Sequence, residues 1–217
     1  MLSEKKELET TQNVATCGNL FVVSSPSGGG KGTLIQRVLK ELPNVSYSVS
    51  YTTRAPRNGE VEGREYFFVT AEKFESMIAA GEFLEWANVY GKLYGTSRGQ
   101  VTREVCEGRD IILEVDVQGA ESVRELIADA VSIFILPPSL EILRQRLVAR
   151  GTDSPAELEV RLRNAPHELG AYKEFDYVII NDDVERAAGQ LTSIIEAERV
   201  RRERQESRIK HMVESFC

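Results

Sequence analysis

Short apolar runs alternate with segments of helical pattern along most of the chain. Runs with few polar and many β-branched residues occur at 20–23, 111–115, 131–136 and 177–180. Such runs are typical of strands that are buried on both faces of a parallel sheet. Helices are expected next to them, at residues 33–42, 97–107, 120–128 and 139–150. Strands that alternate with helices predict βαβ units, so the expected fold class is α/β, with a parallel sheet flanked by helices.

The segment from about residue 46 to residue 95 interrupts this rhythm and is interpreted as an insertion. It is richer in turn-forming and aromatic residues than the rest of the chain. Extended segments are expected at 45–51, 66–69, 83–90 and 92–95, with a helix at 71–80. Trp86 is expected to belong to the core rather than to contact a ligand.

The two ends of the chain are predicted to differ. Residues 1–18 are expected to form a flexible leader. A helix is expected from residue 155 toward residue 169, and Pro166 inside it should kink or end it. One long helix is expected from residue 184 onward, and its arginine-rich part, residues 199–208, is interpreted as solvated.

Composition narrows the class of protein. The 217 residues carry 27 Lys and Arg against 34 Asp and Glu, a net charge of −7, which argues against a nucleic-acid-binding protein. No apolar run approaches the roughly 20 residues that span a bilayer, and the first residues do not form a signal peptide. Three cysteines without metal-ligand spacing indicate free thiols in a reducing compartment. We therefore expect a cytoplasmic protein that binds neither nucleic acid nor membrane, as a monomer or a homo-oligomer.

The strongest chemical signal is a glycine-rich stretch between the first expected strand and the first expected helix. It consists of Ser25, Pro26, Ser27, Gly28, Gly29, Gly30, Lys31, Gly32 and Thr33. Glycines let backbone N–H groups converge on phosphate oxygens, the helix N-terminus adds positive charge, and the lysine reaches the outer phosphates. This context predicts a P-loop. Two positions depart from the usual pattern, because Ser25 stands for its first glycine and Gly32 for the Ser or Thr that helps to hold Mg²⁺.

Arginines in two places suit phosphate binding. Arg54 and Arg57 lie three residues apart on a proline-containing loop, and guanidinium groups grip phosphate with paired hydrogen bonds. Arg146 and Arg150 share one helix face, and Arg161 lies on the next expected helix. Three arginines on a helical hairpin would suit a lid over transferring phosphates. The alternative is an exposed helix with salt bridges, and the arginines alone do not decide between the two.

Two carboxylates end a buried strand, at Glu114 and Asp116. Ligands of open α/β sheets bind at the carboxyl ends of strands, so these groups are placed for Mg²⁺, its waters or a substrate. The two histidines, His167 and His211, form no catalytic triad or metal cluster in the sequence. A kinase whose acceptor is already a phosphate needs no general base, because charge neutralisation and alignment carry its catalysis.

Several stretches resemble the guanylate kinases, a family of P-loop nucleoside-monophosphate kinases. Their order and spacing together are highly specific, and they span residues 20–198. The stretches are 24–31 (SSPSGGGK), 50–57 (SYTTRAPR), 59–69 (GEVEGREYFFV), 83–87 (FLEWA), 94–96 (YGT), 116–120 (DVQGA), 135–139 (ILPPS), 150–152 (RGT) and 181–183 (NDD).

The resemblance implies an activity, a domain plan and a set of site residues. The activity is the reversible reaction ATP + GMP ⇌ ADP + GDP, with dGMP also accepted and Mg²⁺ as cofactor. The domain plan is a P-loop core (19–49, 97–145 and 170–217), a small mixed GMP-binding insertion (50–96) and a helical lid (146–169). By the matching positions, Arg54, Arg57, Tyr66 and Tyr94 would hold the GMP phosphate, and Ser50, Glu85, Thr96 and Asp116 would read guanine. The transferring phosphoryl group would be stabilised by Lys31, Arg146, Arg150 and Arg161, and Asn181 would lie near the adenine of ATP.

The chemistry of guanine supports the role of Glu85 independently. Guanine presents N1–H and an exocyclic NH₂ side by side, and one carboxylate accepts from both, whereas adenine presents an acceptor at N1. A mismatched buried polar pair gives discrimination on the order of 10⁴-fold. Two alternatives remain open: an adenylate or other nucleotide kinase, suggested by Gly32 and Thr33, and a non-catalytic guanylate-kinase-like module that binds proteins.

Overall fold

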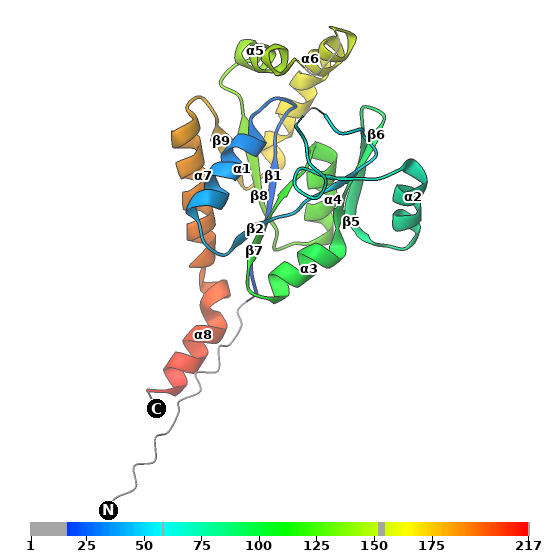
Figure 1. Ribbon diagram of the computed structural model, residues 1–217. Helices are drawn as coiled ribbons and strands as arrows, with labels where there is room; N and C mark the ends of the chain where they lie inside the picture. Colours follow the sequence, from blue (N-terminus) through cyan, green and yellow to red (C-terminus); the bar gives the residue numbers. More distant parts are fainter. Residues whose placement is uncertain (1–16, 58, 152–154, 217) are drawn as a thin grey trace, which may run out of the picture.

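The computed structural model describes residues 17–57, 59–151 and 155–216 (Figure 1). Most of the predicted leader, residues 1–16, lies outside the described residues. Within the parts of the chain that are described, no helix combines the length and the apolar character needed to cross a membrane.

The centre of the molecule is a sheet of five parallel strands in the order β2-β7-β1-β8-β9. The strands are β1 (Leu20–Ser24), β2 (Val45–Tyr47), β7 (Asp110–Glu114), β8 (Val131–Leu136) and β9 (Tyr177–Ile180). β1 is central and entirely buried, as its uninterrupted apolar sequence predicts. The α/β fold class is confirmed.

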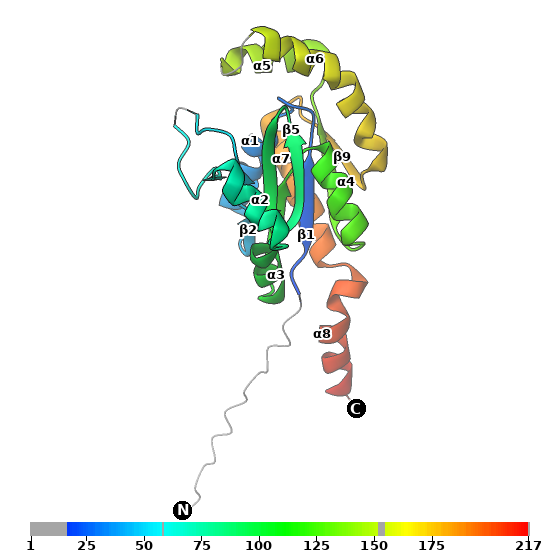
Figure 2. The ribbon, with the colours of Figure 1, turned by 90° about the vertical axis from the view of Figure 1, so that its right-hand side faces the viewer.

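Helices cover both faces of this sheet and make three layers (Figure 2). On one face, α1 (Lys31–Glu41) and α7 (Val184–Arg199) pack against alternate strand residues such as Phe21 and Val23. On the other face, α3 (Arg98–Cys106) and α4 (Val117–Leu126) pack against the intervening residues, such as Leu20 and Val22. The central strands β1 and β7 thus contribute to both halves of the core, which explains why their runs have few polar positions. In the edge strand β9 only Ile179 is buried.

The interrupting segment forms a second, mixed sheet in the order β4-β3-β6-β5. Its elements are β3 (Tyr51–Thr52), β4 (Phe67–Phe68), α2 (Ala71–Ala79), β5 (Phe83–Val89) and β6 (Lys92–Ser97). A small core of Phe74, Met77 and Phe83 holds it together. The expected single strand at 45–51 is wrong, because β2 joins the central sheet and β3 joins the second one. Trp86 is 47% exposed on β5, so the expectation that it belongs to the core is wrong too.

A helical hairpin lies over the carboxyl ends of the central strands (Figures 1 and 2). It consists of α5 (Leu140–Arg150) and α6 (Pro155–Gly170), joined by an apolar cluster around Leu143, Leu147 and Ala165. A short helix, η1 (Ala171–Glu174), follows. Helix α6 runs through Pro166 to Gly170, so of the two expected effects of Pro166, a kink or an end, the end is wrong. Burial of the adjacent Ala165 in the apolar cluster stabilises the helical path across the one missing backbone hydrogen bond.

The expected long C-terminal helix is divided into two. α7 ends at Arg199, and α8 (Arg202–Glu214) begins three residues later and extends away from the sheet (Figure 1). Gln205 Nε2 donates to the Arg199 carbonyl at 2.8 Å, and Arg204 Nη2 donates to the Asp129 carbonyl at 3.1 Å. The first bond satisfies a carbonyl that a continuous helix would bond to a backbone N–H, and the second ties α8 to the turn between α4 and β8. Both bonds stabilise the break.

Candidate active site

The glycine-rich stretch forms a tight loop between β1 and α1. Gly28 and Gly30 have φ angles of 89° and 96°, in the left-handed region that glycine tolerates. A Cβ on Gly30 would lie 2.3 Å from Asn181 Nδ2, and one on Gly28 would lie 3.0 Å from Leu147 of the lid. The loop therefore requires glycine at both places, for backbone conformation and for space.

Lys31, the first residue of α1, is held across this loop. Its Nζ donates a 3.0 Å hydrogen bond to Ser25 Oγ, and Ser25 Oγ donates to the Pro26 carbonyl at 2.8 Å. Ser25, which replaces the first glycine of the usual pattern, thus positions the lysine in the absence of a nucleotide. Asn181, which follows β9, also holds the loop, because its Nδ2 donates to the Gly29 carbonyl at 2.9 Å.

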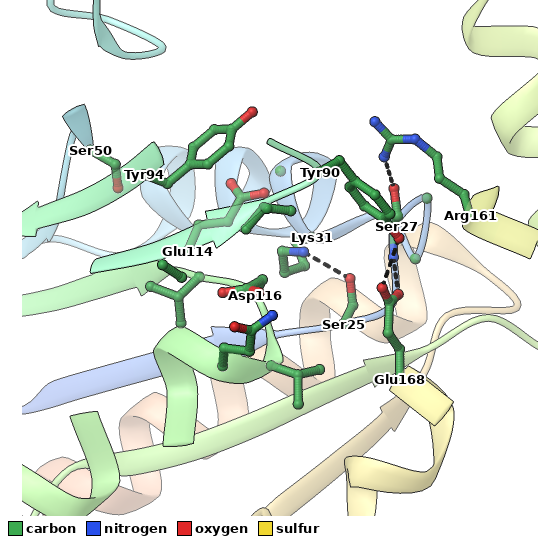
Figure 3. Close-up of a pocket in the computed structure, with 18 of the residues that line it drawn as sticks. Ser25, Ser27, Lys31, Ser50, Tyr90, Tyr94, Glu114, Asp116, Arg161 and Glu168 are labelled. Atoms are coloured by element: carbon green, nitrogen blue, oxygen red, sulfur yellow. Dashed lines mark hydrogen bonds between the residues drawn. The ribbon is translucent and has the colours of Figure 1, made fainter. Parts of the chain in front are cut away.

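One cleft of about 1230 Å³ joins this loop to the second sheet and the lid (Figure 3). Most of the predicted site residues line it: Ser25, Ser27, Gly28, Gly29, Gly30, Lys31, Gly32, Thr33, Ser50, Arg54, Arg57, Tyr66, Glu85, Tyr94, Glu114, Asp116, Arg146, Arg161 and Asn181. Pro26 and Thr96 do not line it, since Pro26 is buried in the loop and Thr96 lies behind Glu85. Arg150 is the last residue of α5, but its side chain lies outside the described residues.

At the end of the cleft that is lined by the second sheet, the carboxylate of Glu60 contacts both Arg54 and Arg57. Glu60 accepts from both Nη atoms of Arg54, at 2.8 and 2.9 Å, and from the backbone N–H of Arg57 at 2.7 Å. The Arg54 guanidinium stacks 5.3 Å from the ring of Tyr66, which meets Tyr94 edge-on at 5.8 Å. Burial raises the pKa of the Tyr66 phenol, so it stays a hydrogen-bond donor. Cations and donors gathered in this way suit a dianionic phosphate.

Glu85 lies deeper in the same end and is only 6% exposed. Thr96 Oγ1 donates to Glu85 Oε1 at 2.5 Å. Burial raises the pKa of Glu85 to about 7, against the opposing effect of the Thr96 hydrogen bond. Gly119 leaves room for the carboxylate, since a Cβ there would lie 2.8 Å from Glu85 Oε2. Asp116 caps α4 by accepting from the Gly119 N–H at 3.0 Å.

Glu114 ends β7 beside the phosphate loop. A Cβ on Gly32 would lie 3.6 Å from Glu114 Oε2, and Tyr47 Oη donates to the same oxygen at 3.2 Å. A carboxylate at the edge of a phosphate-binding loop is the kind of hard oxygen donor that Mg²⁺ prefers. The residues present therefore fit a magnesium ion that also binds nucleotide phosphates.

The α5–α6 hairpin places two arginines against the glycine-rich loop. Arg146 Nη1 donates to the Gly29 carbonyl at 3.3 Å and its Nη2 donates to the Asn181 carbonyl at 2.8 Å, while Arg161 donates to Ser27 Oγ. Sequence reasoning missed other residues that line the cleft, among them Tyr90 and Glu168. The seven-residue spacing of Arg161 and Glu168 was the available signal, since it places both on one face of a helix.

Comparison with known proteins identifies the family. A sequence model described as Guanylate kinase matches residues 17–198. The guanylate kinase of Symbiobacterium thermophilum is 53% identical over 184 residues, which are 85% of this chain and 87% of that protein. The guanylate kinase of Thermotoga maritima is 46% identical over 192 residues, 88% of this chain and 93% of that protein. The crystal structure of guanylate kinase from Anaplasma phagocytophilum has a TM-score of 0.74 and 37% identity, and the match covers 89% of this chain and 96% of that one.

These relatives also decide between the alternatives. They are named as kinases of GMP rather than of AMP, so Gly32 and Thr33 do not mark an adenylate kinase. Similarity at this level, with Lys31 and the three glycines before it present in the loop, also excludes the non-catalytic module. The predicted resemblance is confirmed, and the chain belongs to the guanylate kinase family, whose catalytic members transfer a phosphoryl group from ATP to GMP.

Proposed function

We propose that the cleft aligns ATP and GMP so that the γ-phosphoryl group of ATP passes directly to the GMP phosphate, giving ADP and GDP. The observation that carries this proposal is the buried carboxylate of Glu85 at one end of the cleft whose other end is the phosphate loop with Lys31. A GMP phosphate oxygen forms the new bond to the γ-phosphorus while the bond to the ADP oxygen breaks. The attacking oxygen carries no proton at neutral pH, so no general base is needed.

The donor phosphates are bound by the phosphate loop. Its N–H groups and the N-terminus of α1 offer partial positive charge, and Lys31 moves from Ser25 to the outer phosphates. Arg146 and Arg161 approach the loop from the lid and neutralise charge on the transferring group, with Arg150 in the same role. Asn181 supports the loop and borders the ATP adenine.

The acceptor phosphate is held by Arg54, Arg57, Tyr66 and Tyr94. Glu60 fixes the Arg54 guanidinium through two parallel hydrogen bonds, so less rotamer freedom is lost when a phosphate binds. Tyr66 presents its phenol from the residue before β4, and Tyr94 presents its phenol from β6, with β3 between these two strands of the sheet. Alignment of two phosphates in a fixed geometry supplies a large part of the rate enhancement of such reactions.

Glu85 reads guanine by accepting from N1–H and the exocyclic NH₂. Thr96 saturates one lone pair of the carboxylate and fixes its plane, while Ser50 and Asp116 border the base. These contacts leave the ribose 2′ position without an assigned partner, which is consistent with dGMP as a second acceptor.

Mg²⁺ would be held mainly by nucleotide phosphates and waters, with Glu114 as the protein carboxylate and Asp116 nearby. When bound, the ion would neutralise charge that develops between the two phosphates. Gly32 contributes no hydroxyl, so Glu114 is the oxygen donor that the chain offers at this place.

The test is ADP formation from ATP and Mg²⁺ with GMP, dGMP, AMP, CMP and UMP offered separately. The proposal expects turnover with GMP and dGMP, and loss of most GMP turnover in Glu85→Gln. Glu82→Gln is the matched control, because Glu82 is exposed and precedes the same strand. Turnover with AMP, or equal activity of both variants, would contradict the assignment of Glu85 to the base.

A further inference from the structure

The turn between β5 and β6 places an unusual residue at the cleft. Tyr90 and Gly91 form a two-residue connection in which both φ angles are positive, 51° and 77°. Asparagine, aspartate or glycine is favoured at the first of these positions, because the left-handed conformation is strained for a tyrosine. The conformation of the turn therefore does not explain why position 90 is a tyrosine.

The side chain of Tyr90 reaches the lid (Figure 3). Its Oη donates to Glu168 Oε1 at 3.1 Å, and the Arg161 guanidinium lies 4.9 Å from the centre of its ring. Arg161 and Glu168 are seven residues apart on α6, close to two full turns, so they present one face to the same neighbours. A single side chain of the acceptor insertion thus contacts both of these charged residues of α6.

The same two lid residues hold the phosphate loop. Glu168 Oε2 accepts from the backbone N–H of Ser27 at 3.1 Å, and Arg161 donates to the Ser27 hydroxyl. Both carboxylate oxygens of Glu168 are therefore used, one toward the loop and one toward the insertion. Ser27, Tyr90, Arg161 and Glu168 form a closed set of contacts between three separate segments, which we call the Tyr90–Glu168 bridge.

We propose that Glu168 is a positioning residue that transmits closure of the GMP-binding insertion to the lid arginine and the phosphate loop. When GMP draws the insertion toward the core, the bridge forms and places Arg161 over the loop beside Ser27. ATP then binds to a phosphate loop and to an arginine, Arg161, that are already ordered. This inference rests on the proposed placement of GMP in the insertion and of ATP on the loop.

The charge of Glu168 makes it suited to this role. Hydrogen bonds to a charged acceptor are stronger than neutral ones, and a carboxylate presents its two oxygens in opposite directions. A long arginine that is not oriented by a neighbour loses more conformational entropy when it closes on a substrate. The Tyr90 ring and Glu168 reduce that loss, but only while the insertion is close enough to touch the lid.

The test measures how GMP changes the affinity for a non-hydrolysable ATP analogue, by calorimetry on the full-length protein. The ratio of the two dissociation constants, without and with saturating GMP, is the coupling factor. In the unmodified protein we expect saturating GMP to lower the dissociation constant of the ATP analogue by about tenfold. Glu168→Gln and Tyr90→Phe should each bring the factor toward one and lower kcat, while the affinity for GMP alone changes less than about twofold.

Two further variants separate positioning from support of the fold. Tyr90→Asn removes the phenol and ring but suits the turn, so it should lose coupling without losing thermal stability. Glu159→Gln makes the same charge change on an exposed part of α6, where Glu159 pairs only with Arg163 among the contacts described, and should leave coupling unchanged. The double variant of Glu168→Gln and Tyr90→Phe should lose no more coupling than either single one.

The proposal would be overturned by a coupling factor that Glu168→Gln leaves unchanged. It would also be overturned if that variant weakened both ligands equally and lowered the unfolding temperature, since this result would indicate a merely structural role. A factor of one in the unmodified protein would overturn it as well, with the proposed function untouched. Failure of the unmodified protein to bind GMP would instead reject the proposed acceptor site.

Discussion

Thr96 donates a 2.5 Å hydrogen bond to the carboxylate of Glu85, and both residues are buried. The bond stabilises the ionised form and so opposes the effect of burial, which is larger and raises the pKa of Glu85 to about 7. Near neutral pH the free enzyme therefore contains both protonated and ionised Glu85. Only the ionised carboxylate accepts from both guanine donors, so binding of the base favours release of a proton.

Affinity for the guanine base should accordingly rise with pH. Below pH 7 the dissociation constant of guanosine should fall by up to about tenfold for each pH unit, and it should level off above pH 8. Guanosine is used because the phosphate of GMP titrates near pH 6 and would add its own dependence. Calorimetry between pH 5.5 and 8.5 measures the effect, and Glu85→Gln should abolish the slope. A pH-independent affinity in the unmodified enzyme would show that the ionisation of Glu85 is not linked to binding.

Gly119 should be required for the binding of GMP but not for the binding of ATP. In Gly119→Ala the new Cβ would stand 2.8 Å from Glu85 Oε2, and the carboxylate would have to leave the position in which Thr96 holds it. We expect the KM for GMP to rise by about one order of magnitude, with the KM for ATP unchanged. Gly189→Ala is the matched control, because Gly189 is also inside a helix and a Cβ there meets nothing within 4 Å. Equal effects of the two substitutions on KM would reject this role.

The effect of Glu114 on metal binding should depend on which residue stands at position 32. Gly32→Ser fits the structure, since its Cβ would lie in ordinary contact, 3.6 Å from Glu114 Oε2. The new hydroxyl offers Mg²⁺ the ligand that this chain lacks. Glu114→Gln should therefore weaken metal binding by about tenfold in the natural background and by less when Gly32→Ser is also present.

Titration of the enzyme–ATP complex with Mn²⁺, followed by electron paramagnetic resonance, measures this affinity without turnover. Glu121→Gln, which removes an exposed carboxylate from α4, serves as the control for loss of charge. If Glu114→Gln weakened Mn²⁺ binding to the same extent in both backgrounds, Glu114 would not compensate for the missing hydroxyl.

The sequence predicted the layers of the core well because the central strands β1, β7 and β8 are buried. An uninterrupted run such as 20–23 has few structural alternatives, and the glycines of the phosphate loop have a direct backbone reason. Trp86 was misplaced for the opposite reason. β5 packs one face on the core and exposes the other, and the sequence alone does not say which face Trp86 takes.

Contacts between distant segments were the part that the sequence could not predict. Tyr90 and Glu168 are 78 residues apart, and nothing in either local pattern indicates the other. The role of Glu60 in orienting Arg54 was missed as well, because the two residues lie six positions apart in a segment without helical or strand periodicity. Such pairs depend on how the insertion and lid fold back on the core, which local periodicity does not encode.

Arg199 contacts a buried aspartate, although the local sequence indicates a solvated helix end. This contact leads to a prediction about stability. Residues 199–208 were expected to be solvated, but Arg199 Nε donates to the buried Asp110 at 2.7 Å, and its Nη2 donates to the Pro43 carbonyl at 2.8 Å. Asn19 supplies two more donors to the other oxygen of Asp110, at 2.7 and 2.9 Å. Arg199 therefore compensates the charge of a carboxylate whose side chain is only 6% exposed.

In Arg199→Ala this buried charge loses its counterion, so the free energy of unfolding should fall by about 1–3 kcal/mol, less than for a fully buried pair because Arg199 itself is 28% exposed. The matched variant Arg202→Ala removes an exposed pair with Glu203 and should change stability by less than about 0.5 kcal/mol. Urea denaturation measures both, and kcat should be unaffected, because Arg199 does not line the cleft. Equal stability of the two variants would mean that the hydrogen bonds from Asn19 alone are enough to stabilise the buried Asp110 side chain at the start of β7.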